Sequence, residues 1–225
     1  MRSVVLLSGG MDSTLTATIA AKESDEVCAI HFNYRHRTER RELKSFNNVC
    51  DRLGISNRLV VDIEFLRQIG GSSLVDPSIP VTKADLETKH IPSSYVPFRN
   101  GTFLAIATGW AEAIDAERIY IGAVEEDSSG YPDCRKIFFD AFEQAVNLGT
   151  KPDTHITVET PLIVMTKSEI VQRSYELSSP LELTWSCYQS EDVACGECDS
   201  CALRLRGFRQ AGFIDPLEYR IRPEY

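Results

Sequence analysis

The stretch SVVLLSGGMDSTLTATIA, residues 3–20, constrains the fold more than any other part of the chain. An apolar run ends at Ser8, the pair Gly9 and Gly10 follows, and a helical pattern begins at once. Glycines let backbone N–H groups approach an anion closely, and a helix N-terminus adds its dipole and unpaired N–H groups. We therefore expect a strand, a phosphate-binding loop and a helix in direct succession.

The loop matches neither of the two common nucleotide-binding patterns. It lacks the Gly-Lys-Ser/Thr ending of a Walker loop and the third glycine of the dinucleotide fingerprint. The hydroxyls of Ser8, Ser13 and Thr14 add donors, which suits a pyrophosphate. Asp12 would repel phosphate unless a metal bridges the two, so it is interpreted either as a Mg²⁺ contact or as a favourable charge at the helix N-terminus.

Apolar, β-rich runs alternate with helical patterns along most of the chain. The pattern predicts a doubly wound α/β fold with a parallel sheet of about five strands covered on both faces. The expected strands are residues 3–8, 26–32, 58–63, 118–123 and 155–159. A capping-box pattern at 166–169 predicts the start of another helix. Two long loops, 70–100 and 124–135, are candidates to close over a ligand at the carboxyl edge of the sheet.

The alternation stops after Pro180, which predicts a main domain over residues 1–180 and a small C-terminal segment over 181–225. This segment carries four cysteines at Cys-x₇-Cys-x₂-Cys-x₂-Cys spacing: Cys187, Cys195, Cys198 and Cys201. Four soft ligands at turn-like spacing favour one closed, structural zinc site. A ferredoxin-type cluster and a thioredoxin-like redox pair are the alternatives, and both match the spacing less well.

Composition and charge limit the cellular compartment and the classes of binding partner that we expect for the protein. No apolar run is long enough to span a membrane, so we expect no membrane partner. No secretory signal pattern is seen either, and we therefore expect the seven cysteines to lie in a reducing cytoplasm. The net charge of −9 argues against broad nucleic-acid binding. A local basic patch of Arg204, Arg206 and Arg209 is interpreted as a solvated helix face.

Ser-Gly-Gly-Met-Asp-Ser resembles the pyrophosphate loop of the N-type ATP pyrophosphatases, whose fold is adenine nucleotide alpha hydrolase-like. The resemblance implies that ATP is cleaved between its α and β phosphates. It also implies ATP contacts over residues 8–14, which are Ser8, Gly9, Gly10, Met11, Asp12, Ser13 and Thr14.

With VPFRN, SSGYPDCR and the cysteines added, nearly the whole chain resembles the 7-cyano-7-deazaguanine synthase family. The resemblance implies an ATP-dependent ligase that converts 7-carboxy-7-deazaguanine and ammonia to the nitrile through adenylated acid and amide, with Mg²⁺, zinc and a homodimer. One departure is Tyr34-Arg35-His36-Arg37, where the family usually has Tyr-Gly-Gln-Arg. This stretch follows the second strand, so we expect it to lie near the nucleotide site.

The family motifs and the chemistry suggest a set of site residues. Asp12, Ser13 and Lys167 are the catalytic candidates, with Lys167 as a phosphate contact or, alternatively, a surface lysine in a helix cap. The substrate-binding candidates are Arg99, Asn100, Asp133 and Arg135. In this interpretation Asp133 accepts the N–H donors of the guanine-like base, and Arg99 or Arg135 faces the carboxylate. Alternatively, Asn100 caps a helix and Asp133 shapes a turn.

Two other functions are considered. A tRNA-modifying thiolase or lysidine synthetase would also adenylate its substrate, but the acidic charge and the lack of an added RNA-binding domain disfavour it. A zinc-bearing nucleic-acid-binding module without catalysis is disfavoured by the intact Ser8–Ser13 loop. Cys134 is not expected to be a nucleophile, because no partner histidine is positioned by the sequence.

Overall fold

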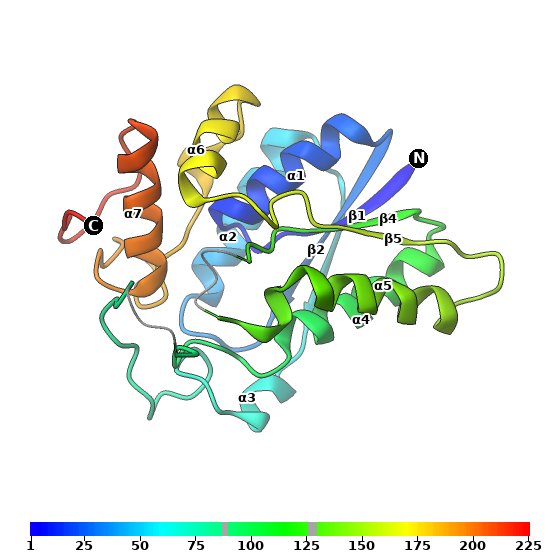
Figure 1. The fold of residues 1–225 in the computed structure, drawn as a ribbon, viewed down its shortest axis with the longest axis horizontal. Coiled ribbons are helices and arrows are strands. Elements are labelled where there is room, and N and C mark those ends of the chain that lie inside the picture. The colour runs from blue at the N-terminus through cyan, green and yellow to red at the C-terminus, as the bar shows by residue number, and fades with distance from the viewer. Residues whose placement is uncertain (87–89, 126–129) are drawn as a thin grey trace.

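A five-stranded parallel sheet in the order β3-β2-β1-β4-β5 organises the molecule (Figure 1). The computed structural model describes residues 1–86, 90–125 and 130–225. The strands are β1 (Arg2–Leu6), β2 (Glu26–Asn33), β3 (Asn57–Asp62), β4 (Arg118–Ile121) and β5 (Thr157–Glu159). The α-helices are α1 (Met11–Glu23), α2 (Glu39–Leu53), α3 (Phe65–Ile69), α4 (Arg99–Ala113), α5 (Lys136–Gly149), α6 (Lys167–Glu176) and α7 (Asp199–Ala211). Short 3₁₀ turns lie at Pro132–Cys134 and Leu181–Leu183.

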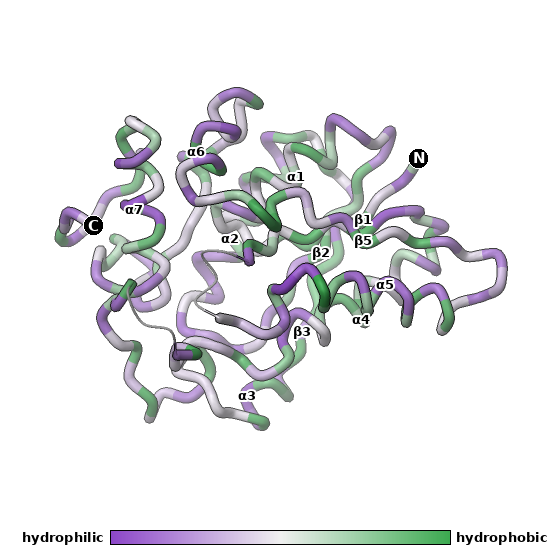
Figure 2. The backbone as a smooth tube through the Cα atoms, in the orientation of Figure 1, coloured by the Kyte–Doolittle hydropathy of each residue, from purple (hydrophilic) through white to green (hydrophobic). Residues whose placement is uncertain are grey.

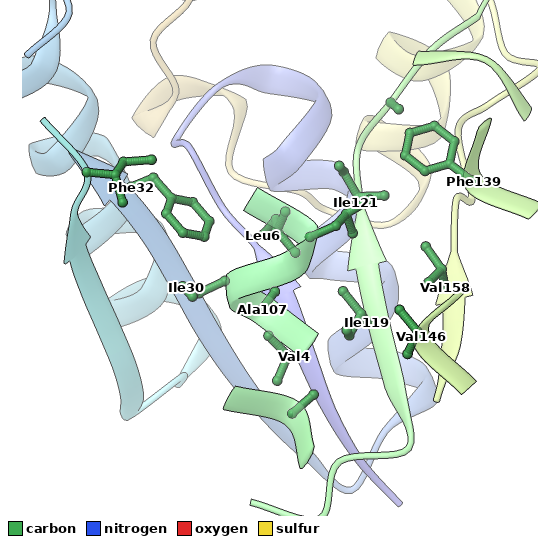
Figure 3. Packing of buried hydrophobic residues seen from close by; sticks show 14 of the residues in the cluster. Val4, Leu6, Ile30, Phe32, Ala107, Ile119, Ile121, Phe139, Val146 and Val158 are labelled. Atoms are coloured by element: carbon green, nitrogen blue, oxygen red, sulfur yellow. The ribbon is translucent and has the colours of Figure 1, made fainter. Parts of the chain in front are cut away.

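Alternate residues of each strand face opposite layers of helices, because side chains alternate across a strand. Val4 and Leu6 of β1 pack with β2, β4 and β5 on the face covered by α4 and α5, as Figure 3 shows. Val5 and Leu7 face α1 and α2 on the other side. In Figure 2, α5 alternates between hydrophobic and hydrophilic residues, as expected for a helix with one buried face. The sheet is therefore covered on both faces, which confirms the predicted fold class.

The strands lie where the sequence predicts them, with ends that differ by up to two residues. β4 ends at Ile121 rather than at 123, because the chain leaves the sheet at Gly122 to pass α1. A Cβ atom at Gly122 would lie 3.0 Å from the backbone oxygen of Asp12, so only glycine allows this approach. The predicted capping box is confirmed: Thr166 and Glu169 exchange side-chain and backbone hydrogen bonds at the start of α6.

The segment after residue 180 packs on the main domain through α7. Helix α7 lies beside α6 (Figure 1), and Phe208 shares one apolar cluster with Met11 and Leu15 of α1. A Cβ atom at Gly207 would lie 2.7 Å from the Cβ atom of Lys167, so glycine lets the two helices approach closely. The boundary at residue 180 stays a prediction, and the apolar packing runs across it.

Among the described residues, no helix is long and apolar enough to span a membrane.

Candidate active site

One cavity of about 270 Å³ lies at the carboxyl ends of β1, β2 and β4. Ligands of open α/β sheets bind at this edge. The glycine loop forms one part of its wall, α6 and α7 another, and the residues after β2 a third. The cavity therefore brings together side chains that are far apart in the sequence.

The loop between β1 and α1 has the form expected of an anion site. Ser8 Oγ lies 3.0 Å from Ser13 Oγ and accepts a hydrogen bond from Gly10 N at 3.2 Å. Within residues 1–86, 90–125 and 130–225 no side chain caps the start of α1, and the first N–H groups of a helix have no partner within it. Ser8, Gly10, Met11, Asp12 and Ser13 line the cavity. Their arrangement suits a bound phosphate group.

Two of the predicted loop contacts lie away from the cavity. Gly9 has a φ of +88° and its Cα packs against α2, where a Cβ atom would lie 2.7 Å from Ser45 Cβ and 2.8 Å from Glu42 O. Thr14 is fully buried and is not part of the cavity wall. The structure thus gives Gly9 a steric role and leaves the predicted phosphate contact of Thr14 without direct support.

Asp12 and Lys167 meet across the cavity, although 155 positions separate them in the sequence. Lys167 Nζ donates to Asp12 Oδ2 at 2.6 Å, and Lys167 is 9% exposed, so the alternative of a surface lysine is wrong. The second oxygen, Asp12 Oδ1, is buried and has no hydrogen-bond partner in the described part of the chain. A carboxylate oxygen facing the phosphate site without a partner fits a Mg²⁺ ligand.

Arg99 enters the cavity from the first turn of α4 and is surrounded by aromatic side chains. Its guanidinium lies 3.4 Å from Tyr34 Oη, and Tyr131 and Tyr188 also line this region. No Asp or Glu oxygen of residues 1–86, 90–125 or 130–225 lies within 4.0 Å of it. Although burial opposes the charge, the surrounding tyrosines raise the pKa of Arg99, which therefore stays cationic. A half-buried cation with no carboxylate beside it among the described residues fits an anionic ligand.

Asp133 holds the start of α4 in place. Its Oδ2 accepts from Asn100 N at 2.8 Å, and its backbone oxygen accepts from Asn100 Nδ2 at 3.1 Å. Asn100 is thus the second residue of the helix rather than its cap, and it lines the cavity. Asp133 is 3% exposed and does not line the cavity. Arg135 is exposed, and its Nε donates to Pro132 O at 3.1 Å, so neither side chain is brought to the cavity with Arg99.

Cys134 is held as a neutral thiol. Burial raises its pKa to about 11, and its Sγ accepts from Asn100 Nδ2 at 3.2 Å. These observations agree with the expectation that it is not a nucleophile, which requires a thiolate. Four residues of the predicted loop 124–135, at 126–129, lie outside the described residues.

The four C-terminal cysteines form one buried cluster, and all four Sγ atoms lie within 4.8 Å of one another. Sγ atoms bound tetrahedrally to zinc at about 2.3 Å lie about 3.8 Å apart, and Cys195 and Cys201 are 3.9 Å apart. Cys187 Sγ accepts from two backbone N–H groups, at 3.3 and 3.4 Å, and Cys195 Sγ from two more, at 3.4 Å each. Such donors stabilise thiolates, so the cluster fits a tetrahedral metal ion.

Arg204 corrects one expectation from the sequence. It is 1% exposed and forms an ion pair of 2.8 Å with Asp215, so it is not part of a solvated face. It also donates to Thr184 Oγ1 at 2.7 Å. This ion pair ties α7 to the segments before and after it.

The cavity wall also contains Tyr34 and His36, from the strand end that the sequence places near the nucleotide site. Sequence reasoning missed the other side chains that complete the wall. They come from β2, from α2 and from the segment before α7: His31, Glu42, Trp185 and Tyr188. Nothing local identifies Trp185, whose backbone N–H donates to Gly9 O at 2.8 Å.

The fold and site together define a class: parallel α/β proteins with a phosphate-type loop after the first strand, here combined with a C-terminal four-cysteine cluster. Residues 2–212 match the family described as "Queuosine biosynthesis protein QueC", and the chain belongs to this family.

Similar proteins agree with this assignment. A protein of Chlorobium phaeobacteroides (strain DSM 266) named 7-cyano-7-deazaguanine synthase is 58% identical over 225 residues, 100% of both chains. A protein of the same name from Chlorobaculum tepidum is 57% identical over 100% of this chain and 99% of its own.

Solved structures show the same fold at low identity. One is a predicted subunit of a tRNA methyltransferase from Methanocaldococcus jannaschii, with a TM-score of 0.52 and 15% identity over 100% of this chain and 93% of that one. Another is a 4-thiouridine synthetase in complex with RNA and ATP, with a TM-score of 0.52 and 16% identity over 97% of this chain and 47% of that one. At these identities the likeness concerns the fold alone.

Proposed function

We propose that the chain is an ATP-dependent ligase that converts 7-carboxy-7-deazaguanine and ammonia to 7-cyano-7-deazaguanine. One observation carries the proposal: a half-buried, cationic Arg99 without a carboxylate partner in the described residues shares one cavity with a phosphate-type loop. Such a cavity suits an acid and a nucleotide side by side. The relatives that share 54–58% identity carry the name of this activity.

In the proposed reaction, a carboxylate oxygen of the substrate attacks the α-phosphorus of ATP and pyrophosphate leaves. Ammonia then displaces AMP from the acyl adenylate to give the amide. A second adenylation, on the amide oxygen, allows AMP to leave again as the nitrile forms. Each adenylation places negative charge on the departing pyrophosphate, so fixed positive groups around it lower the barrier.

The described residues suggest which side chain has which role in the proposed reaction. The N–H groups at the start of α1 and the hydroxyls of Ser8 and Ser13 would hold the phosphates, and Lys167 would offset their charge. Arg99 and Asn100 would bind the carboxylate end of the acid. We assign Asp133 a positioning role, since it holds the turn of α4 that carries both side chains. Arg135 lies outside the cavity and receives no role.

The proposal includes two metal ions and a cellular setting. Asp12 Oδ1 would bind Mg²⁺, which neutralises phosphate charge. The cysteine cluster would bind one structural zinc ion. We also propose that the protein is a cytoplasmic homodimer whose substrates are 7-carboxy-7-deazaguanine, ammonia and ATP, and that it binds no nucleic acid. The net charge of −9 supports the last point.

The deciding experiment incubates the purified chain with 7-carboxy-7-deazaguanine, ammonium and MgATP and follows all products by mass spectrometry. The expected products are the nitrile, AMP and pyrophosphate, with the amide as a transient species. Formation of ADP, or of an amide that is never consumed, would contradict the proposal. If product appears only when tRNA is supplied and its bases are modified, the thiolase or lysidine synthetase alternative would replace it.

A further inference from the structure

The cavity wall behind the glycine loop carries three ionisable side chains that the roles above leave unused. His31 on β2 is 1% exposed, His36 after β2 is 6% exposed, and Glu42 lies in the first turn of α2. We call these three residues the His31–Glu42 wall. It adjoins the loop directly, because a Cβ atom at Gly9 would lie 2.8 Å from Glu42 O.

The hydrogen bond of His31 fixes which of its nitrogens can accept. Nδ1 lies 3.0 Å from Leu7 O, and a carbonyl oxygen only accepts, so the proton is on Nδ1. Burial lowers the pKa of His31, so the ring stays neutral and Nε2 keeps its lone pair. Nε2 is buried and accepts from no group in the described ranges. A buried acceptor without a donor destabilises the folded chain unless a ligand supplies the donor.

Glu42 adds a carboxylate to the same wall. Thr38 Oγ1 donates to its Oε1 at 2.9 Å. Its Oε2 lies within ion-pair distance of His36 Nε2, at 3.1 Å, and this neighbour lowers the pKa of Glu42 against the opposing effect of burial. The angle at either ring nitrogen of His36 is not that of a hydrogen bond to any described group. The wall thus presents an acceptor lone pair and a carboxylate, and no Lys or Arg of the described chain donates to either.

We propose that the His31–Glu42 wall binds ammonium, the nitrogen donor of the reaction, so this inference rests on the proposed function. Ammonium is a small cation that only donates hydrogen bonds, in several directions, and therefore matches a buried lone pair beside a carboxylate. The wall opens into the same cavity as Arg99 and the loop, where the acyl adenylate would form. In this arrangement Glu42 supplies the counter-charge, and the Nε2 lone pair of His31 orients the nitrogen and accepts the proton that ammonium loses before ammonia attacks.

The test compares Glu42→Gln with Glu39→Gln in the full-length chain. Glu39 lies on the same helix, but its carboxylate accepts from Arg35 N at 2.5 Å and does not line the cavity. We expect Glu42→Gln to raise KM for ammonium about 10–100-fold, the size of one lost charged hydrogen bond. KM for ATP and for the acid should change less than about 2-fold, and Glu39→Gln should leave all three unchanged.

A second nucleophile distinguishes the counter-charge that Glu42 supplies from its effect on the position of the nucleophile. Hydroxylamine is uncharged near neutral pH, so its use by Glu42→Gln should be impaired far less than the use of ammonium. An equal loss with both nucleophiles would overturn the counter-charge role. A rise in KM for ATP instead of ammonium would show that the wall holds the amino group of adenine, which also overturns the proposal.

Two controls keep the inference apart from the proposed function. If the unaltered chain forms no product from the acid, MgATP and ammonium, the proposed function fails, and the variants are not needed to show it. If Glu42→Gln does not fold, as judged by its melting curve, His31→Leu takes its place, because it removes the Nε2 lone pair, the other acceptor of the wall. An unchanged KM for ammonium in a folded variant overturns the site.

Discussion

Gly9 illustrates how one residue can fix the shape of the nucleotide loop. Its φ of +88° favours glycine, and a Cβ atom there would lie 2.7 Å from Ser45 Cβ and 2.8 Å from Phe46 N. We therefore expect Gly9→Ala to lower the free energy of unfolding by about 2–4 kcal/mol, since strain and overlap add. Gly54 is the matched control, with a φ of +69° and no atom of the described residues within 4 Å of an added Cβ. Gly54→Ala should cost about 1 kcal/mol.

Denaturant unfolding measures both variants. Equal losses in Gly9→Ala and Gly54→Ala would show that the contact with α2 does not hold the loop. A second measurement is the increase in unfolding free energy when inorganic phosphate is added. Gly9→Ala should lose this increase because its loop is displaced, whereas Gly54→Ala should keep it.

His31 gives a prediction about pH. Burial lowers its pKa below the ordinary value of 6.5, so below that pH the unfolded chain takes up a proton that the folded chain does not. The stabilisation is therefore full above pH 6.5 and is lost as pH falls toward the folded-state pKa, by up to about 1.4 kcal/mol per pH unit. The unfolding free energy of the His31→Gln variant should fall less steeply over this range. Parallel curves for the two proteins would contradict the neutral, buried ring.

At the scale of secondary-structure elements, α4 depends on a side chain from a distant turn. Asp133 accepts from the backbone of Asn100 in the first turn of α4, next to Arg99. Asp133→Ala should therefore cost about 1–2 kcal/mol of stability and raise KM for the carboxylate substrate, while KM for ATP stays unchanged. Asp140→Ala is the control, because among the described residues Asp140 pairs only with Lys136, on the surface of α5, and its loss should cost less than about 0.5 kcal/mol.

Urea denaturation and steady-state kinetics test the two aspartate variants together. A KM for ATP that rises with the KM for the acid would mean that the turn supports the whole cavity rather than the substrate end. Equal stability losses in both variants would mean that the cap at α4 contributes nothing specific.

Elements whose signals are local could be predicted from the sequence. The loop after β1 and the capping box at Thr166 depend on neighbours within a few positions, and both lie where the pattern indicates. The strands are apolar runs that any buried parallel sheet requires, so their positions along the sequence could be predicted. Their ends could not, because β4 stops where Gly122 meets α1, a contact that the sequence does not record.

The candidate site could be predicted only in part, because it too depends on contacts between segments that are far apart in the sequence. Lys167 was a candidate, yet its partner Asp12 is visible only once α6 packs beside α1. Asp133 looked like a ligand contact because its motif lies in a loop, but burial directs its carboxylate to α4. Arg204 looked like a surface residue because arginines usually are, and its pairing with Asp215 depends on the path of the C-terminal tail.

For the whole molecule, the cysteine cluster and the cavity form one connected structure. Trp185 N donates to Gly9 O at 2.8 Å, and Tyr188, the neighbour of Cys187, lines the cavity. The tail packs on the cluster as well: a Cβ atom at Gly196 would lie 2.0 Å from Ile221 O. Loss of the metal should therefore disturb both the C-terminal segment and the nucleotide loop.

Cys198→Ala tests this connection. The variant should lose bound zinc, melt lower by about 10 °C, and form AMP more slowly, because the segment that carries Trp185 is no longer fixed. Cys28→Ala is the matched control: Cys28 is equally buried, but it lies on β2 away from the cluster. It should lower stability through lost packing while retaining zinc and turnover. Metal analysis, melting curves and AMP release are measured on the same preparations. If Cys198→Ala loses zinc but keeps full turnover, the cluster stabilises the tail alone and the connection through Trp185 is refuted.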